Sequence, residues 1–150
     1  MSDTARRKRE HLDAIAQDPA IERGNSGFAA IRLTHRALPE LALADIDTRC
    51  EFLGKTLRLP LLISSMTGGD DPEIRRINHN LAQAAEQSGI ALAVGSQRGQ
   101  FTNPAAEASF RLREIAPNTV LLANLGAVQL NYGFGVEYCR RAVETLAADG

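Results

Sequence analysis

The chain has 150 residues, of which 44% are hydrophobic, and its 17 basic and 18 acidic residues leave a formal net charge of -1. This composition fits one globular domain and excludes intrinsic disorder, and the near-zero charge argues against a nucleic-acid binder. No apolar run reaches the roughly 20 residues that cross a bilayer. The charged N-terminal segment lacks the apolar core of a secretory signal, and two cysteines are too few for a disulfide scaffold. We therefore expect a soluble, cytoplasmic protein that binds neither membranes nor nucleic acid.

The first predicted element is a helix over residues 2–17. Arg7 and His11 lie four positions apart and share one face of it. Lys8 is turned by about 100° from Arg7, close enough for both to contact one anion. The alternative is a basic helix end that is simply solvated. Further along, residues 28–33 predict a short extended segment.

Residues 45–59 have the pattern of a β-hairpin that turns at Gly54-Lys55. Three short apolar segments then follow, without the polar alternation of a half-exposed strand. They are residues 61–65, 90–94 and 120–123. Continuous apolar runs of this length are typical of strands that are buried on both faces of a parallel sheet.

Helices are predicted after each of these strands. Asp71 is placed as the N-cap of the first helix, which ends at Gly89. A second helix begins at Asn103, and a third runs from about Gly135 with Cys139 buried on its apolar face. Strands that alternate with crossover helices predict an α/β fold with a parallel sheet. The pattern alone leaves open whether the sheet is a closed barrel or an open, doubly wound sheet.

The loops after the three predicted strands are rich in small and hydrogen-bonding residues. They are residues 65–69, 95–98 and 124–126. Loops at the carboxyl ends of parallel strands are the usual ligand sites of α/β folds. Glycine lets backbone N–H groups approach a ligand, and Thr, Ser and Asn side chains match the edge of a heteroaromatic ring. Arg98 adds a cation that can bind phosphate. The alternatives are loops that only form tight turns and an Arg98 that only forms a surface ion pair.

Other familiar sites are absent from the sequence. It contains no GxSxG, HExxH, CxxC or GxxxxGK[ST] motif, and its histidines lack metal-type spacing. We therefore expect no metal site among these residues and no hydrolase of a familiar type.

Four motifs in this order resemble those of the type 2 isopentenyl diphosphate isomerases. They are Arg7-Lys8-x-x-His11, Ser64-Ser65-Met66-Thr67-Gly68-Gly69, Gly95-Ser96-Gln97-Arg98 and Asn124-Leu125-Gly126-Ala127. The resemblance implies a (β/α)8 TIM barrel that binds FMN and interconverts isopentenyl and dimethylallyl diphosphate. It also implies a requirement for NADPH, which reduces the flavin, and for Mg²⁺, and a homo-oligomer.

The resemblance assigns roles to individual residues. FMN would be contacted by one group of side chains and backbone atoms, namely Met66, Thr67, Gly68, Ser96 and Asn124. The diphosphate substrate would be bound by a second group, namely Arg7, Lys8, Ser96, Gln97 and Arg98. His11 matches its motif, and no catalytic residue is assigned within this chain.

The chain departs from the family in length, because a barrel of this type takes roughly 250 residues or more. Residues 1–60 would form an N-terminal arm and hairpin, and residues 61–150 only the first three of eight strand–helix units. The glutamine that faces the substrate and the Mg²⁺-binding glutamate of the family lie on later strands, so we expect this chain alone to be inactive. Two alternatives stay open: an FMN barrel of the 2-hydroxy-acid oxidase type, and a non-catalytic half-barrel that binds phosphate or a partner chain.

Overall fold

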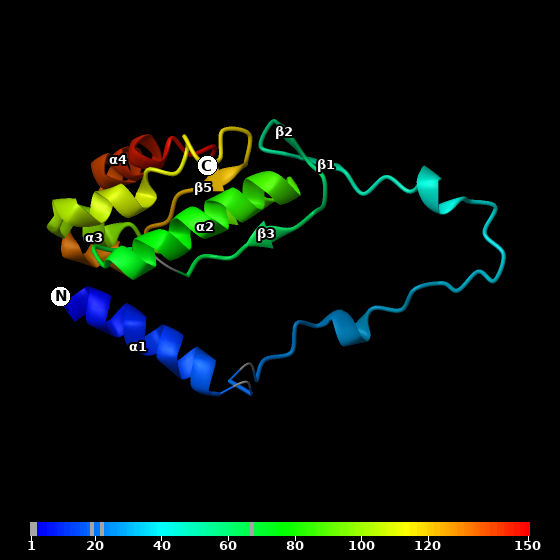
Figure 1. The fold of residues 1–150 in the computed structure, drawn as a ribbon, viewed down its shortest axis with the longest axis horizontal. Coiled ribbons are helices and arrows are strands. Elements are labelled where there is room, and N and C mark those ends of the chain that lie inside the picture. Colours follow the sequence, from blue (N-terminus) through cyan, green and yellow to red (C-terminus); the bar gives the residue numbers. More distant parts are fainter. Residues whose placement is uncertain (1–2, 19, 22, 67) are drawn as a thin grey trace.

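The computed structural model describes residues 3–18, 20–21, 23–66 and 68–150. Its helices and strands, in chain order, are α1 (Asp3–Gln17), β1 (Cys50–Phe52), β2 (Lys55–Leu57), β3 (Leu62–Ile63), α2 (Pro72–Ser88), β4 (Ala91–Ala93), α3 (Arg98–Thr102), β5 (Leu121–Leu122) and α4 (Val136–Leu146) (Figure 1). Short 3₁₀ helices cover Phe28–Ala30 (η1), Leu43–Asp45 (η2), Pro104–Phe110 (η3) and Ala127–Tyr132 (η4). Within the described residues, no helix is both long and apolar enough to cross a membrane.

The three apolar segments form one parallel sheet in the order β3-β4-β5, as predicted. Leu62 lies opposite Ala91 in the first pair of strands, and Leu92 lies opposite Leu121 in the second. Each strand is thus the neighbour of the next along the chain, and all three point the same way. Their carboxyl ends therefore meet at one edge of the sheet, where the predicted ligand loops begin.

Helix α2 has both of its predicted ends. The Asp71 side chain accepts hydrogen bonds from the backbone N–H groups of Glu73 at 2.9 Å and Ile74 at 3.3 Å, so it caps the N-terminus. Gly89 follows the last turn in a left-handed conformation. Local sequence signals alone therefore suffice to set the bounds of this helix.

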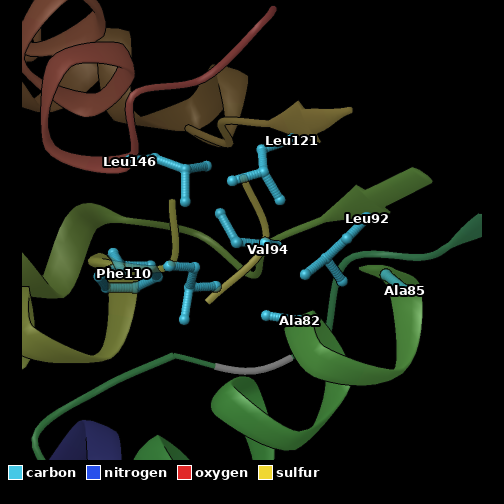
Figure 2. Close-up of a cluster of buried hydrophobic side chains, with 9 residues drawn as sticks. Ala82, Ala85, Leu92, Val94, Phe110, Leu121 and Leu146 are labelled. Carbon is cyan, nitrogen blue, oxygen red and sulfur yellow. The ribbon is translucent and has the colours of Figure 1, made fainter. Parts of the chain in front are cut away.

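The main core lies between the sheet and the helices (Figure 2). Leu92, Val94 and Leu121 project from the sheet region towards a group of buried side chains on the surrounding elements, namely Ala82, Ala85, Phe110, Leu112, Ala116 and Leu146. A second cluster joins Leu57 of the hairpin to Ala91 and Val120. Strand β4 is thus covered on both faces, which is why its sequence shows no alternation. The expected burial on both faces is wrong for the segment of β3, because Leu61 and Leu62 are 55% and 42% exposed.

The hairpin forms as predicted, but its turn lies one residue earlier. Leu53 and Gly54 are the turn residues, with φ angles of 48° and 77°, and Lys55 already belongs to β2. Two positive φ angles give the turn whose twist matches that of the flanking strands. Leucine is rare at such a position, which is why the sequence favoured Gly54-Lys55.

Two predicted elements have a different secondary structure from the one predicted. The segment predicted as extended begins with η1 instead, after Gly27 at a φ of 80°. The helix predicted from Asn103 starts there, because the Asn103 side chain accepts a hydrogen bond from Ala105 N–H at 3.1 Å. It is the 3₁₀ helix η3, however, and the short α-helix α3 precedes it where a loop was expected.

Cys139 is exposed, so its predicted burial is wrong. It lies on α4 beside a cavity of about 210 Å³ that Ala123 and Leu125 also line. These two residues follow β5, which is the last strand of the sheet. Residues 149 and 150 bond to the backbone edge of β5, since the Asp149 N–H donates to the Leu121 carbonyl at 2.9 Å and the Ala123 N–H donates to the Gly150 carbonyl at 2.8 Å. The side of α4 that includes Cys139 is left exposed beside the cavity.

Residues 23–49 form an arm that runs outside the body of the molecule between α1 and β1 (Figure 1). Every residue in this range is exposed, including large apolar side chains such as Phe28, Leu33 and Leu38. Leu33 and Leu38 are 89% and 92% exposed. The arm therefore makes no contribution to the core described above.

Asp149 joins the hairpin to the sheet. Its Oδ2 atom accepts hydrogen bonds from the Leu121 N–H at 2.9 Å, the Lys55 ammonium at 3.1 Å and the Arg113 guanidinium at 2.8 Å. Burial opposes ionisation of this carboxyl group, but these hydrogen bonds outweigh it and hold the pKa of Asp149 below its ordinary value. The depressed pKa means that the ionised form stabilises the fold.

We expect Asp149→Asn to lower the free energy of unfolding at pH 7 by about 2 kcal/mol, less than for a fully buried ion pair because Lys55 and Arg113 keep some contact with water. The stabilisation is present above the aspartate pKa of the unfolded chain, about 3.9, and is lost as pH falls through the lower pKa of the folded state. Urea unfolding of both proteins at pH 7 and at pH 3 measures this. The control is Glu137→Gln, which removes an exposed ion pair with Arg140. If the free energy of unfolding of Asp149→Asn were lower than that of the parent by the same amount at pH 7 and pH 3, the expectation would be contradicted.

Candidate active site

The three post-strand loops are held together by hydrogen bonds at the carboxyl edge of the sheet. The Asn124 side chain, after β5, donates to the Ser65 hydroxyl, after β3, at 3.2 Å. Asn124 also exchanges two bonds with Gln97, after β4. The Gln97 N–H donates to the Asn124 carbonyl at 2.8 Å, and the Asn124 N–H donates to Gln97 Oε1 at 3.0 Å. The loops therefore form one surface.

Gln97 occupies a different place from the one predicted for it. Its side chain is fully buried, with an exposed fraction of 0%. The amide nitrogen donates to the Ala142 carbonyl of α4 at 2.8 Å, and the amide oxygen accepts from Asn124. Because both ends of the amide are bonded within the protein, Gln97 has no surface with which to line a substrate. Its role in this structure is to fix the loops against α4.

Helix α1 is fastened to the same edge by Arg9, which the sequence showed only as part of a basic run. Its guanidinium donates to the Asp71 carboxylate at 2.6 Å and lies 3.4 Å from the carboxylate of Glu73. Burial opposes ionisation of Asp71, but the hydrogen bonds from Arg9 and from the start of α2 keep its pKa below the ordinary value. The cap of α2 thus also fastens α1, and in Figure 1 the two helices approach at their N-terminal ends and diverge from there.

Four of the predicted substrate-binding residues line one cavity of about 260 Å³. Arg7 and Lys8 reach it from α1, Ser96 from the loop after β4, and Arg98 from the first position of α3. Gly99, Gly126 and Gln129 complete the lining. Residues that are some 90 positions apart in the chain are therefore brought to a single polar hollow.

The cations around this cavity repel one another. Burial of Lys8, together with the charges of Arg7 and Arg98, lowers the Lys8 pKa from 10.5 to about 8. The Lys8 ammonium also donates to the Gly68 carbonyl. Like charges gathered in a partly desolvated hollow are stabilised by an anion between them. The basic end of α1 is therefore more than a solvated helix face, and its geometry suits a multiply charged anion.

The predicted flavin contacts lie around the same edge. Met66 is half exposed, Ser96 is exposed and Asn124 is partly buried. Thr67, the remaining side chain of this set, lies outside the described residues. The exposed hydroxyl of Ser96 and the side-chain amide of Asn124 provide the donors and acceptors that a heteroaromatic ring requires.

Gly68 is buried and has a φ angle of 152°. A Cβ atom built on it would lie 2.3 Å from Cζ of the Phe110 ring. Phe110 belongs to the main core, so it has little room to move. The backbone of this loop can therefore lie against the core only because residue 68 has no side chain.

No group of three or more His, Cys, Asp or Glu side chains that could hold a metal ion occurs among the described residues. The side chains that line the cavity are cationic or neutral.

The family of FMN-dependent dehydrogenases matches residues 3–116. The chain belongs to this family. Among curated proteins, it is 59% identical over 146 residues to the isopentenyl-diphosphate delta-isomerase of Paracoccus zeaxanthinifaciens, a match of 97% of this chain and 42% of the relative. It is 52% identical over 151 residues to the protein of that name from Hydrogenovibrio crunogenus, with 99% and 44% covered. It is 43% identical over 150 residues to that from Synechocystis, with 99% and 43% covered.

The chain thus spans less than half the length of these curated relatives. All three have the name that the ordered motifs led us to expect. The segment that matches the family includes α1 and the residues of the first two post-strand loops, and it ends before the loop after β5. The family match therefore covers Arg7, Lys8, Ser96 and Arg98, whereas the matches to the curated relatives extend over nearly the whole chain.

The Lys8 pKa predicts how anion affinity changes with pH. We expect the affinity for inorganic sulfate, whose charge is constant over this range, to fall roughly tenfold between pH 7 and pH 9 as Lys8 loses its proton. Lys8→Arg should bind sulfate with a flat profile, and Lys8→Met should bind it weakly and also with a flat profile. Titration calorimetry across this range measures the three profiles, and an unchanged slope in Lys8→Met would exclude Lys8 as the titrating group.

Gly68→Ala tests the close approach of the first loop to the core. We expect it to lower the free energy of unfolding by about 2 kcal/mol, since the new Cβ meets the Phe110 ring and the φ angle suits only glycine. Gly126→Ala is the matched control in another post-strand loop, because its Cβ would meet no atom closer than 3.9 Å. Equal stabilities of the two variants in urea unfolding would show that the contact with Phe110 relaxes freely.

Proposed function

We propose that the whole protein interconverts isopentenyl and dimethylallyl diphosphate with the help of reduced FMN, and that this chain supplies the wall of the active site that binds the diphosphate. The convergence of Arg7, Lys8 and Arg98 on one cavity carries this proposal. The names of the relatives support it, since each is an isopentenyl-diphosphate delta-isomerase.

The residues that line the cavity would bind a diphosphate in different ways. Arginine offers a planar fork that pairs with two phosphate oxygens, and lysine offers a compact point charge. Lys8 keeps its proton at pH 7 because its pKa is about 8. Ser96 adds a neutral hydroxyl at the side of the cavity. Partial burial of this set reduces screening by water and strengthens each contact.

We propose that FMN is held by the loops after β3, β4 and β5, through Met66, Thr67, Gly68, Ser96 and Asn124. Reduced FMN would supply proton-transfer chemistry at the substrate without net oxidation. Helix α1, fastened through Arg9 to Asp71, would cover this edge and exclude water from a reactive, cation-like substrate. NADPH as the reductant of the flavin and Mg²⁺ as a further counter-charge of the diphosphate belong to the same proposal.

The architecture we propose is a (β/α)8 barrel that opens with these strands. Neighbouring strands in chain order, all parallel, are what a closed barrel requires. We propose residues 1–60 as an arm and hairpin before the barrel, and residues 61–150 as its first part. The cavity beside β5, which Leu125 and Val143 help to line, and the exposed apolar arm support a larger assembly of elements around this sheet. A cytoplasmic homo-oligomer completes the proposal.

The rival reading as a 2-hydroxy-acid oxidase fits the cavity less well. Its substrate has a single carboxylate, whereas three cationic side chains line this cavity. A diphosphate has enough negative charge to offset all three. If the chain is a non-catalytic half-barrel, a longer protein that contains it should have no enzymatic activity. An activity measurement therefore distinguishes this alternative from the proposed function.

To test the function, this chain would be fused to the part of the Paracoccus relative that follows its matching segment. We expect the fusion to convert isopentenyl diphosphate into dimethylallyl diphosphate anaerobically with reduced FMN. Arg7→Met and Lys8→Met should each raise KM tenfold or more, the effect of losing one charged hydrogen bond. Arg140→Met, on the exposed face of α4, is the control and should leave KM unchanged. Peroxide release with oxidation of a hydroxy acid would favour the oxidase, and a folded fusion without either activity would favour the non-catalytic reading.

A further inference from the structure

Gln129 has a buried side chain that is not fully hydrogen-bonded. Only 6% of the residue is exposed, and its Oε1 atom has no hydrogen-bond partner among the residues that the structure describes. Buried polar groups in folded proteins are almost always paired, because a group removed from water without a partner destabilises the fold. The unpaired carbonyl oxygen of Gln129 therefore calls for a donor.

The position of Gln129 provides one. It lies in η4, after β5, and lines the same cavity as Lys8 and Arg98. Its backbone is held at both ends, because its N–H donates to the Gly126 carbonyl at 2.8 Å and its carbonyl accepts from the Phe134 N–H at 3.2 Å. The side chain thus starts from a fixed backbone, as a residue that orients a ligand should.

We propose that Gln129 is a further binding residue of this cavity: its Oε1, which lacks a partner, accepts from a cation of the cavity when the diphosphate binds, and its Nε2 group donates to a phosphate oxygen. The proposal rests on the proposed function and adds a residue to it. A primary amide has two N–H donors for phosphate oxygens and one carbonyl that can accept from a neighbouring ammonium or guanidinium. Gln129 would therefore bridge the anion and its cations.

A neutral donor contributes something that a fourth cation could not. Arg7, Lys8 and Arg98 attract an anion from any direction, and they already repel one another. An amide on a fixed backbone adds a directional bond without adding to that repulsion. We therefore expect Gln129 to affect the affinity for a diphosphate without changing the salt dependence of binding, which reports on the charged groups.

Gln100 is the matched control. It is also 6% exposed, and neither its Nε2 nor its Oε1 has a partner within the described part of the chain. It lies in α3 and is not among the residues that line the cavity. The two glutamines thus share their burial and an unpaired Oε1 atom, and they differ in access to the proposed ligand.

The experiment measures binding of inorganic pyrophosphate to the chain by titration calorimetry, together with the thermal unfolding midpoint without ligand. We expect Gln129→Met to weaken binding roughly tenfold to a hundredfold, as for loss of a hydrogen bond to a charged group. Its unfolding midpoint should stay equal or rise, because an unpaired polar group is replaced by an apolar one of similar shape. Gln100→Met should share the effect on the midpoint and leave the affinity within about twofold of the parent.

A comparison with Lys8→Met tests the role of Gln129 separately from the anion cavity itself. It should weaken binding and flatten the salt dependence, whereas Gln129→Met should weaken binding with the slope of the parent. If Lys8→Met weakens binding and Gln129→Met does not, the role of Gln129 is overturned and the anion cavity stands. A lower midpoint with unchanged affinity in Gln129→Met would show a purely structural residue. A parent chain that does not bind pyrophosphate overturns the anion cavity and with it the role of Gln129, whereas the activity of the whole protein is decided by the fusion.

Discussion

The candidate site depends on the parallel alignment of β3, β4 and β5. Because the three strands run in one direction, the loops that follow them all leave from one edge, and Asn124 can bond to both Ser65 and Gln97. A shift of one residue in the register would turn every side chain of a strand to the other face. Burial of β4 on both faces does not by itself prevent such a shift, since both faces are apolar. The hydrogen bonds between the loops supply a further constraint on the register, so the site helps to define the sheet on which it is built.

The second constraint is the rotation of successive side chains around α1. Each residue is turned by about 100° from the last, so four consecutive basic residues point in different directions. Arg9 bonds to Asp71, Arg6 bonds to Glu10 at 3.2 Å on the exposed side, and Arg7 and Lys8 line the cavity. The single contact between Arg9 and Asp71 thus places the two cations that line the cavity, Arg7 and Lys8. The apparent charge run is a set of separate contacts, and its meaning comes from the elements that each residue faces.

The sequence predicted the features that short-range rules determine. Asp71 and Gly89 are local helix signals, and a continuous apolar run such as residues 90–94 identifies a buried strand without reference to its neighbours. The motifs also led to the cavity residues. What the sequence could not show were contacts between distant segments. Arg9 meets a partner 62 positions away, and nothing local distinguishes the buried Gln97 from the exposed Ser96 beside it.

Two sets of groups in this structure lack suitable partners, one polar and one apolar. The chemistry of each set indicates the kind of partner that it would take. Around the cavity the groups that call for a partner are polar: cations that repel one another and the unpaired Oε1 of Gln129. A small polar ligand satisfies these, and a protein surface does so poorly. Along residues 23–49 and beside β5 the uncovered groups are apolar, among them Leu33 and Leu38. No small anion covers these, but packed protein does. The first set therefore supports the proposed ligand site, and the second fits the places where further elements of the proposed barrel would pack against this sheet and its arm.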